Sequence, residues 1–391
     1  MDHPHLGADT SASEPVNDSG LLNDPRCHPE RSRESASGLL NDFGWSDAVA
    51  TIFAASADAG DIPARVAAVH RNRMDVLTDA GERSATLEPR LLKAAAEDRP
   101  ATGDWIVLRI DPSGTSARVR AVIARRTAFV RGAAGDKTMA QVIAANIDLV
   151  LVVMAVPHDV NERRLERYLA LAWESGATPA VVLTKCDLVP DVEEQVACVR
   201  GVAPGVDVVA VSAASDDGLQ ALWSLMAPGC TVALLGSSGV GKSTLVNRLA
   251  GSEVMRTADV DRDGRGRHTT THRQLAQLGK GVLVIDTPGM RELQLWSADA
   301  GLEQVFDDIT TLSESCRFRD CQHEREPGCA VSDAVEKGTL ARERVKSWRK
   351  LMREAARARA QGDAVAASAE RARLRTLMRA VRTHGRAKRD R

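Results

Sequence analysis

The sequence predicts a multidomain α/β protein, in which a small β-barrel precedes a mostly parallel sheet and a C-terminal helical module. Short alternating apolar runs fill residues 62–131, which is typical of the strands of a small barrel. Continuous apolar runs alternate with helical periodicity over residues 147–293, as in a parallel sheet covered on both faces. A Cys/His cluster lies past Ala300, and Arg-rich helical sequence follows from Ala341. We therefore divide the chain into residues 1–58, 59–135, 136–300 and 301–391.

Charge is distributed unevenly along the chain. The net charge is −1, from 52 Lys and Arg against 53 Asp and Glu. From Ala341 to Arg391, however, 17 basic residues stand against 5 acidic ones, so this tail carries +12 and the preceding 340 residues carry −13. A strongly basic tail predicts a polyanionic partner.

Neither an export signal nor a membrane span is visible in the sequence. The N-terminus lacks a basic start followed by an apolar run. The longest apolar stretch, residues 149–156, is too short to cross a bilayer, so we expect no membrane association. Seven cysteines in 391 residues, without an export signal, do not indicate a disulfide framework. We therefore expect a cytoplasmic protein.

Residues 1–58 are rich in Ser, Asp, Pro, Gly and Ala and show no sustained periodicity. The string GLLND occurs twice, starting at Gly20 and at Gly38. Sequence of this kind buries little apolar surface, so we predict a disordered extension. A partner-binding arm is the alternative.

Residues 59–135 are predicted to form a closed barrel. Turn residues at Gly81, Gly103 and Pro112 separate its strand-like runs. Five or so strands in about seventy residues favour an OB-fold, the commonest small barrel that binds nucleic acid, and another small barrel is the alternative. The strand-like runs are residues 62–69, 74–77, 105–110 and 117–123.

Residues 136–300 are predicted to form a doubly wound parallel sheet. Helical spacing over residues 162–174 and 219–226 separates apolar runs of strand length. The predicted strands are residues 149–155, 179–183, 206–211, 231–235 and 282–285.

A phosphate-binding loop follows the strand of residues 231–235. Residues 236–243 read GSSGVGKS, which fits G-x-x-x-x-G-K-[ST], and a helix through Leu249 follows. Backbone N–H groups of such a loop, with the helix N-terminus, bind phosphate oxygens. We expect Lys242 to reach the β- and γ-phosphates and act in catalysis, and Ser243 to ligate magnesium. The expected phosphate-binding residues are Gly236, Ser237, Ser238, Gly239, Val240, Gly241, Lys242, Ser243 and Thr244.

The sequence DTPG follows the strand of residues 282–285. Its first residue, Asp286, stands where a carboxylate on the magnesium side is needed. The backbone N–H of Gly289 can then sense the γ-phosphate.

Two further strand ends predict recognition of guanine. Thr184, Lys185, Cys186 and Asp187 follow the strand of residues 179–183. The Asp187 carboxylate can accept hydrogen bonds from guanine N1–H and the exocyclic amine, and the Lys185 stem can pack along the base. After the next strand come Ser212 and Ala213, which can offer a backbone N–H to guanine O6. GTP with Mg²⁺ is therefore the expected ligand.

These loops stand in an unusual order along the chain. In ordinary small GTPases the phosphate loop comes first and the base-reading loops come last. Here residues 184–187 and 212–213 precede residues 236–243. Because strand positions rather than chain order build such a site, we predict a circularly permuted P-loop GTPase domain.

A Cys/His cluster follows this domain. Three cysteines and one histidine stand within fourteen residues, in the pattern C-x4-C-x-H-x5-C. Three thiolates and one imidazole suit a closed tetrahedral zinc site, so we expect one structural Zn²⁺. The expected ligands are Cys316, Cys321, His323 and Cys329.

The order of barrel, permuted domain and Cys/His module resembles the RsgA (YjeQ-type) family of small-ribosomal-subunit biogenesis GTPases. The resemblance covers residues 62–348, and residues 141–148 (QVIAANID), residues 264–271 (GRGRHTTT) and the cysteine pattern look like that family. It implies an OB-fold on rRNA and a cytoplasmic GTPase that the small subunit stimulates late in maturation. Thr184 departs from the Asn of many GTPases, and the basic tail lies outside the match.

Residues 264–271 are expected to be the first switch. Thr270 is expected to close on magnesium and act in catalysis, with the threonines on either side as alternatives. Met290 follows the DTPG sequence, where Ras-like enzymes place the glutamine that orients the attacking water. An apolar side chain cannot orient water, so another polar group is required, and His268 is the candidate.

These observations predict a monomeric, ribosome-stimulated GTPase that binds GTP and GDP, the small ribosomal subunit and its rRNA. It is expected to hydrolyse GTP to GDP and phosphate and to act in late subunit maturation. The alternative is a nucleotide-gated RNA-binding adaptor with little turnover, which is consistent with Met290. An ATP-dependent kinase or transporter ATPase is disfavoured, because residues 184–187 and 212–213 are present and no adenine-recognising device is seen.

Overall fold

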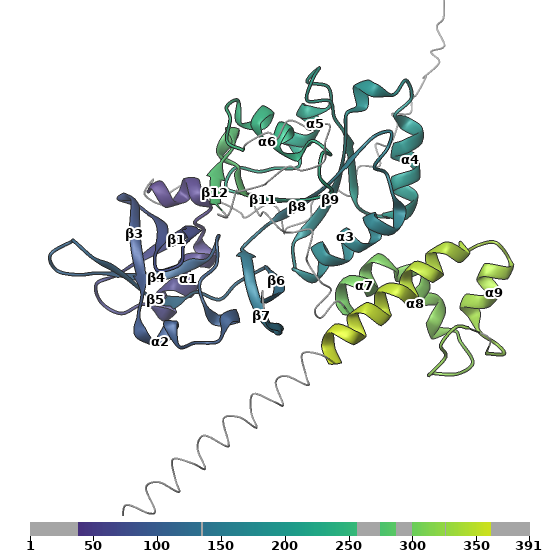
Figure 1. The fold of residues 1–391 in the computed structure, drawn as a ribbon, viewed down its shortest axis with the longest axis horizontal. Helices are drawn as coiled ribbons and strands as arrows, with labels where there is room; N and C mark the ends of the chain where they lie inside the picture. Colours follow the sequence, from purple (N-terminus) through teal and green to yellow (C-terminus); the bar gives the residue numbers. More distant parts are fainter. Residues whose placement is uncertain (1–37, 134–135, 256–273, 287–298, 325, 361–391) are drawn as a thin grey trace, which may run out of the picture.

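The computed structural model describes residues 38–133, 136–255, 274–286, 299–324 and 326–360, and the statements below concern these residues. A barrel, a central sheet between helices and a C-terminal helical module follow one another along the chain, as predicted (Figure 1).

The barrel has five strands in the spatial order β1-β2-β3-β5-β4 and closes by antiparallel pairing of β1 with β4. Its core is apolar and includes Val66, Ile106 and Leu108, all fully buried. One strand, β3, was missed, because Gly81 was read only as a turn residue; it is the first residue of β3 and pairs with Thr78. The strands are β1 (Asp61–Val69), β2 (Met74–Thr78), β3 (Gly81–Leu87), β4 (Trp105–Ile110) and β5 (Ala117–Val122).

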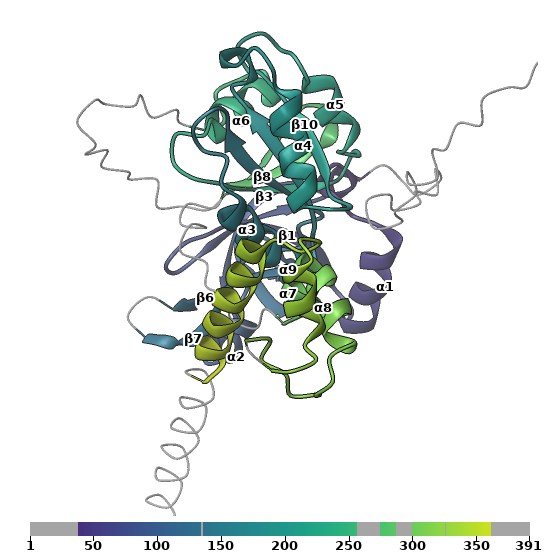
Figure 2. The same ribbon diagram turned by 90° about the vertical axis from the view of Figure 1, so that its right-hand side faces the viewer.

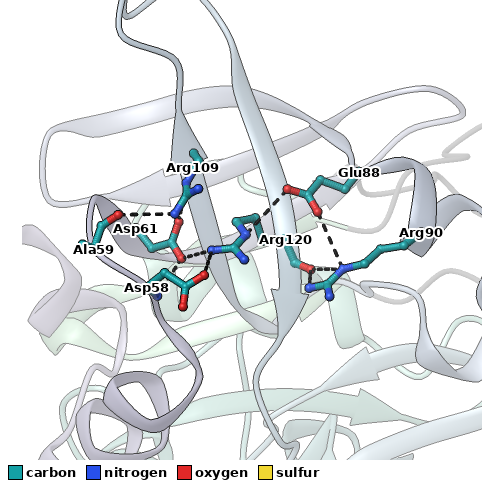
Figure 3. A network of polar contacts seen from close by, with 7 residues as sticks. All are labelled: Asp58, Ala59, Asp61, Glu88, Arg90, Arg109 and Arg120. Carbon is teal, nitrogen blue, oxygen red and sulfur yellow. Dashed lines mark hydrogen bonds and ion pairs between the residues drawn. The ribbon is translucent and has the colours of Figure 1, made fainter.

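A network of charged side chains ties the strands on the outside of the barrel (Figure 3). The carboxylate of Asp61, on β1, accepts from Arg109 Nε of β4 at 2.9 Å and from Arg120 Nη1 of β5 at 2.6 Å. Burial alone would raise the pKa of Asp61, but the Asp58 backbone N–H and the two guanidinium groups hold it below its ordinary value. The network therefore fastens three strands through one ionised carboxylate.

The predicted disorder of residues 1–58 is wrong for residues 39–56. They form η1 (Leu39–Phe43) and α1 (Asp47–Ser56), and Ser46 caps α1 by accepting from the backbone N–H of Val49. The Trp45 ring lies 5.0 Å from that of Trp105 on β4 and 5.9 Å from that of Phe53. Leu40 and Val49 are buried in the same cluster. The polar composition of this segment gives no sign of its few apolar residues, which cover one face of the barrel.

A two-stranded hairpin joins the barrel to the central domain. It pairs β6 (Ala128–Ala133) with β7 (Asp136–Ala145), so the boundary placed between residues 135 and 136 falls at its turn. Phe129 and Ile143 of the hairpin belong to the core of the central domain.

The central sheet has the order β10-β9-β8-β11-β13-β12, in which only β12 is antiparallel to its neighbours. Alternate residues of β8 face two different cores: Val150, Val152 and Met154 one of them, Leu151 and Val153 the other. This confirms strands buried on both faces. The strands are β8 (Leu149–Ala155), β9 (Thr178–Thr184), β10 (Asp207–Ala210), β11 (Thr231–Leu235), β12 (Gln274–Gln277) and β13 (Leu283–Asp286).

Helices cover both faces of this sheet. α3 and α4 contribute to the first core, and α5 and α6 contribute to the second. β12 also pairs with β1 at Ala68 and Gln274, which joins the sheet to the barrel. The helices are α3 (Glu162–Glu174), α4 (Glu193–Val202), α5 (Leu219–Ser224) and α6 (Lys242–Ala250).

The C-terminal module packs against α3 (Figures 1 and 2). It comprises α7 (Asp299–Val305), α8 (Asp307–Glu314), α9 (Ala330–Glu336) and a helix over residues 342–360. Its buried residues are continuous with the core that α3 covers. The rest of the basic tail, residues 361–391, lies outside the described residues. None of the helices in the described ranges is both long and apolar enough to cross a bilayer.

Candidate nucleotide and metal sites

The phosphate loop connects β11 to α6, as its sequence predicts. Gly236 has φ 150°, and a Cβ atom there would lie 2.3 Å from the carbonyl oxygen of Val153 on β8. Gly241, with φ 94°, is the N-cap of α6. Both positions therefore require glycine, and the loop that they bound ends at the N-terminus of α6.

Lys242 folds back over this loop. Its Nζ donates to the carbonyl oxygen of Gly236 at 2.9 Å and to that of Ser237 at 2.5 Å. Asp286, at the end of β13, lies close enough for the Lys242 charge to act on it. Burial raises the pKa of Asp286, and Lys242 partly offsets this effect. Lys242 and Asp286 therefore lie near each other at the phosphate loop, where phosphate and a divalent ion are expected.

The segment predicted to read the base is hydrogen-bonded to the phosphate loop. The hydroxyl of Thr184 donates to the carbonyl oxygen of Val240 at 2.5 Å, and Lys185 Nζ donates to that of Gly239 at 2.8 Å. Lys185 has φ 60°, a left-handed conformation that turns the chain sharply after β9. These bonds fix the position of Thr184 and Lys185 relative to the phosphate loop.

Asp187 and Ser212, which follow two different strands, are in direct contact. The Ser212 hydroxyl donates to Asp187 Oδ1 at 2.6 Å and accepts from the backbone N–H groups of Ala214 and Ser215 at 3.2 and 3.3 Å. No described residue donates to the other oxygen of Asp187, which leaves it available to a ligand. The structure therefore brings together Asp187 and Ser212, which follow β9 and β10.

A pocket of about 410 Å³ lies beside these loops. Of its lining residues, Lys185 and residues 238–240 of the phosphate loop were predicted site residues, whereas Leu188 was not. The remaining lining residues, 155–159, were missed. These residues follow β8, the neighbour of β11, so the meeting of carboxyl ends at one sheet edge could have identified them.

Three predicted site residues lie outside the described residues. They are His268, Thr270 and Gly289, in residues 256–273 and 287–298. Met290 lies there as well.

The Cys/His cluster comes together in space. The ligand atoms of Cys316, Cys321, His323 and Cys329 all lie within 4.8 Å of one another. His323 Nδ1 lies 3.5 Å from the Sγ of Cys316 and 3.5 Å from that of Cys329, and these two sulfurs are 4.0 Å apart. A tetrahedron with Zn–S bonds of about 2.3 Å separates its sulfurs by about 3.8 Å. The cluster therefore has the dimensions of a tetrahedral metal site.

The helix of residues 342–360 holds this cluster in place. Arg349 donates to the carbonyl oxygen of His323, and the ring of Trp348 lies 5.5 Å from the imidazole. Burial, and then the Arg349 charge, lower the pKa of His323, which favours the neutral imidazole that binds metals. Cys329 is the N-cap of α9 and accepts from the backbone N–H of Ser332 at 3.4 Å.

The fold and the site together define a circularly permuted P-loop GTPase fold with a Cys/His module. A model of the RsgA GTPase family matches residues 122–296. A model of the ABC transporter family matches residues 220–373, which contain the phosphate loop but not Asp187 or Ser212.

Relatives match over most of the chain. The small ribosomal subunit biogenesis GTPase RsgA of Opitutus terrae is 45% identical over 359 residues, covering 89% of this chain and 98% of the relative. The protein of that name from Streptomyces coelicolor is 44% identical over 340 residues, covering 85% and 91%. The chain belongs to the RsgA GTPase family, and its enzymatic activity is GTP hydrolysis.

Two solved structures share the fold. YjeQ from Thermotoga maritima matches with a TM-score of 0.57 at 23% identity, over 75% of this chain and 98% of its own. YloQ, described as a circularly permuted GTPase, matches with a TM-score of 0.54 at 23% identity, over 76% of this chain and 96% of its own.

Proposed function

We propose that this GTPase binds the small ribosomal subunit and its rRNA and acts in late subunit maturation, hydrolysing GTP to GDP and phosphate. The observation that carries the specificity for GTP is the contact between Asp187 and Ser212, 2.6 Å apart, beside the phosphate loop. The small subunit as partner follows from family membership, since the relatives carry subunit biogenesis in their names.

Each described loop has one task in nucleotide binding. The backbone N–H groups of residues 236–241 and the N-terminus of α6 hold the phosphates, and Lys242 neutralises the β- and γ-phosphates. Asp187 and the backbone of Ala213 select guanine over adenine. Ser243 would hold Mg²⁺, with Asp286 on the same side and with Thr270, which lies outside the described residues, as a further ligand. When bound, the ion would supply positive charge at the phosphate oxygens.

Hydrolysis depends on a polar group outside the phosphate loop, because Met290 cannot orient water. His268 takes this role when the small subunit is bound, and Gly289 senses the γ-phosphate. We expect His268→Ala to remove most of the subunit-stimulated rate, about 10²–10⁴-fold, while GTP affinity stays almost unchanged.

The metal of the C-terminal module is one structural Zn²⁺. Three sulfurs and an imidazole at tetrahedral spacing form a closed site without an open position for substrate. The metal therefore supplies folding energy to the loop between α8 and α9 rather than chemistry.

The barrel and the basic tail supply contacts to rRNA phosphates. Eight of the residues of the helix 342–360 are Arg or Lys and two are Glu, so this helix alone carries +6. Such contacts weaken as salt rises. The protein acts in the cytoplasm as a monomer.

Sedimentation with purified small subunits tests this function. With a non-hydrolysable GTP analogue the protein should pellet with the subunits, and the pelleted fraction should fall as salt increases. Absence of pelleting at low salt in either nucleotide state would contradict a subunit partner.

The alternative function is an RNA-binding adaptor that is gated by nucleotide and turns over little. The observation in its favour is Met290 in place of a water-orienting glutamine. Turnover with and without subunits separates the two functions.

A further inference from the structure

Arg164 links the first turn of α3 to the phosphate loop. Its backbone N–H donates to the side chain of Asn161, the N-cap, at 3.0 Å, which fixes the start of the helix. Its Nη1 donates to the hydroxyl of Ser237, in the phosphate loop, and to the carboxylate of Asp159. The side chains of Arg164 and Asp159 are 32% and 21% exposed, so solvent screens this pair less than a surface ion pair.

Ser237 is also the residue over which Lys242 folds. The Lys242 ammonium bonds the carbonyl oxygen of Ser237 at 2.5 Å, while the Arg164 guanidinium bonds its hydroxyl. Two cations from different helices, α3 and α6, thus hold one residue of the loop. A shift of Ser237 would therefore move an anchor of the lysine that binds the γ-phosphate.

The pair of Arg164 and Asp159 has hydrogen-bonding capacity to spare. A guanidinium has five N–H donors, and among the described residues only Nη1 of Arg164 has an acceptor. Asp159 Oδ2 is buried and has no hydrogen-bond partner among the described residues. Asp159 also lines the pocket beside the phosphate loop. Among the described residues, this pair therefore has N–H donors and one carboxylate oxygen without hydrogen-bond partners beside the site.

We propose that Arg164 is a positioning residue for GTP hydrolysis, which holds Ser237 and thereby sets Lys242 relative to the β- and γ-phosphates. The inference rests on the proposed GTPase function. A displacement of about 1 Å in a catalytic group can lower turnover about 10²-fold. Binding of the base depends on Asp187 and Lys185 instead, so loss of Arg164 should act on turnover more than on GDP affinity.

Three variants of the full-length protein test the role. Arg164→Ala removes the contact, and Arg164→Lys keeps the charge but replaces the planar guanidinium by an ammonium on a side chain of different reach. Arg163→Ala is the matched control, because Arg163 is the preceding residue of α3, is 59% exposed and pairs with Glu343 rather than with the phosphate loop. For each protein, kcat and KM for GTP are measured with saturating small subunits, together with Kd for GDP and for a non-hydrolysable GTP analogue.

We expect kcat of Arg164→Ala to fall between about tenfold and about 10²-fold, with KM and the GDP Kd changed less than about threefold. The ratio of the GDP Kd to the Kd of the GTP analogue should also be lower for Arg164→Ala than for the unmodified protein. Arg164→Lys should recover part of kcat, and Arg163→Ala should match the unmodified protein.

Two results would overturn the inference. One is an unchanged kcat and analogue preference in Arg164→Ala. The other is an equal loss of affinity for GDP and the analogue together with a lower melting temperature, which would make Arg164 a merely structural residue. If the unmodified protein shows no turnover, the proposed function fails, while the ratio of the two Kd values still decides the role of Arg164.

Discussion

The guanidinium of Arg65, on β1 of the barrel, donates a hydrogen bond to the hydroxyl of Thr231 at 2.8 Å. Thr231 begins β11, the strand that ends at the phosphate loop. Arg65 is 2% exposed and also donates to the carbonyl oxygens of Gly103 at 3.3 Å and Asn146 at 3.2 Å. One buried cation therefore fastens the barrel to the nucleotide-binding sheet.

Arg65→Met should lower the free energy of unfolding by about 3–5 kcal/mol, because it leaves buried acceptors without a donor. Arg126→Met is the matched control. Arg126 also joins the barrel side to the central domain, through Asp148 at 2.7 Å, but its side chain is 49% exposed. A surface pair of this kind contributes less than about 1 kcal/mol. Urea unfolding of the two variants measures the difference, and equally small losses would contradict the role of Arg65.

Asp187→Asn should weaken GTP binding at least about tenfold, because one unmatched polar contact costs about 1–3 kcal/mol. The amide can donate to the oxygen that xanthine carries in place of the guanine amine, so XTP should gain affinity. Asp207 is an exposed residue at the start of β10, at the end of the strand away from Ser212, and Asp207→Asn is the control that should bind GTP normally. Titration with GTP, XTP and ATP checks the result. Unchanged GTP affinity in Asp187→Asn would rule out this carboxylate as the base reader.

Cys321→Ser should remove a stoichiometric zinc and unfold the loop between α8 and α9, since structural zinc supplies folding energy. GTP binding should persist, because the central sheet has its own core. Cys198→Ser is the control, since Cys198 is an exposed thiol on α4. Metal analysis and limited proteolysis follow the two effects. A zinc-free unmodified protein that resists proteolysis would contradict the metal site.

Gly301→Ala should separate the C-terminal module from α3. A Cβ atom at Gly301 would lie 2.3 Å from the carbonyl oxygen of Ala170 and 3.0 Å from the backbone nitrogen of Glu174. Overpacking of this kind costs about 1–3 kcal/mol. Gly201→Ala, on α4, meets no atom within 4 Å and should be neutral or slightly stabilising. Thermal unfolding compares the two, and equal melting temperatures would show that α7 does not depend on this close approach.

Much of the nucleotide site could be predicted because its residues are contiguous in the sequence. The phosphate loop and residues 184–187 each follow a strand that is buried on both faces, and such strands read as unbroken apolar runs. Strand β3 could not be read in this way. In residues 81–87 only Ala85 is buried, so no run or clear alternation marks the strand.

Other features could not be read because they depend on contacts between distant residues. Arg164 and Asp159 meet the phosphate loop only after β8 and β11 lie side by side. Trp45 and Phe53 look like isolated apolar residues in a polar segment until Trp105 provides a surface for them. The order of the elements can be read from local sequence patterns. Such pairings, in contrast, depend on how the strands are arranged in the folded chain.

The rate of GTP turnover in the presence of small ribosomal subunits tests the central claim most directly. The protein alone should hydrolyse GTP at about 10⁻³ per second or less, as unassisted Ras-like enzymes do. Purified small subunits should raise this rate by about 10²-fold or more, and added salt should reduce the stimulation. Whole ribosomes and a reaction without ribosomes serve as comparisons. A rate that small subunits do not change at low salt would contradict a ribosome-coupled GTPase and would favour the adaptor.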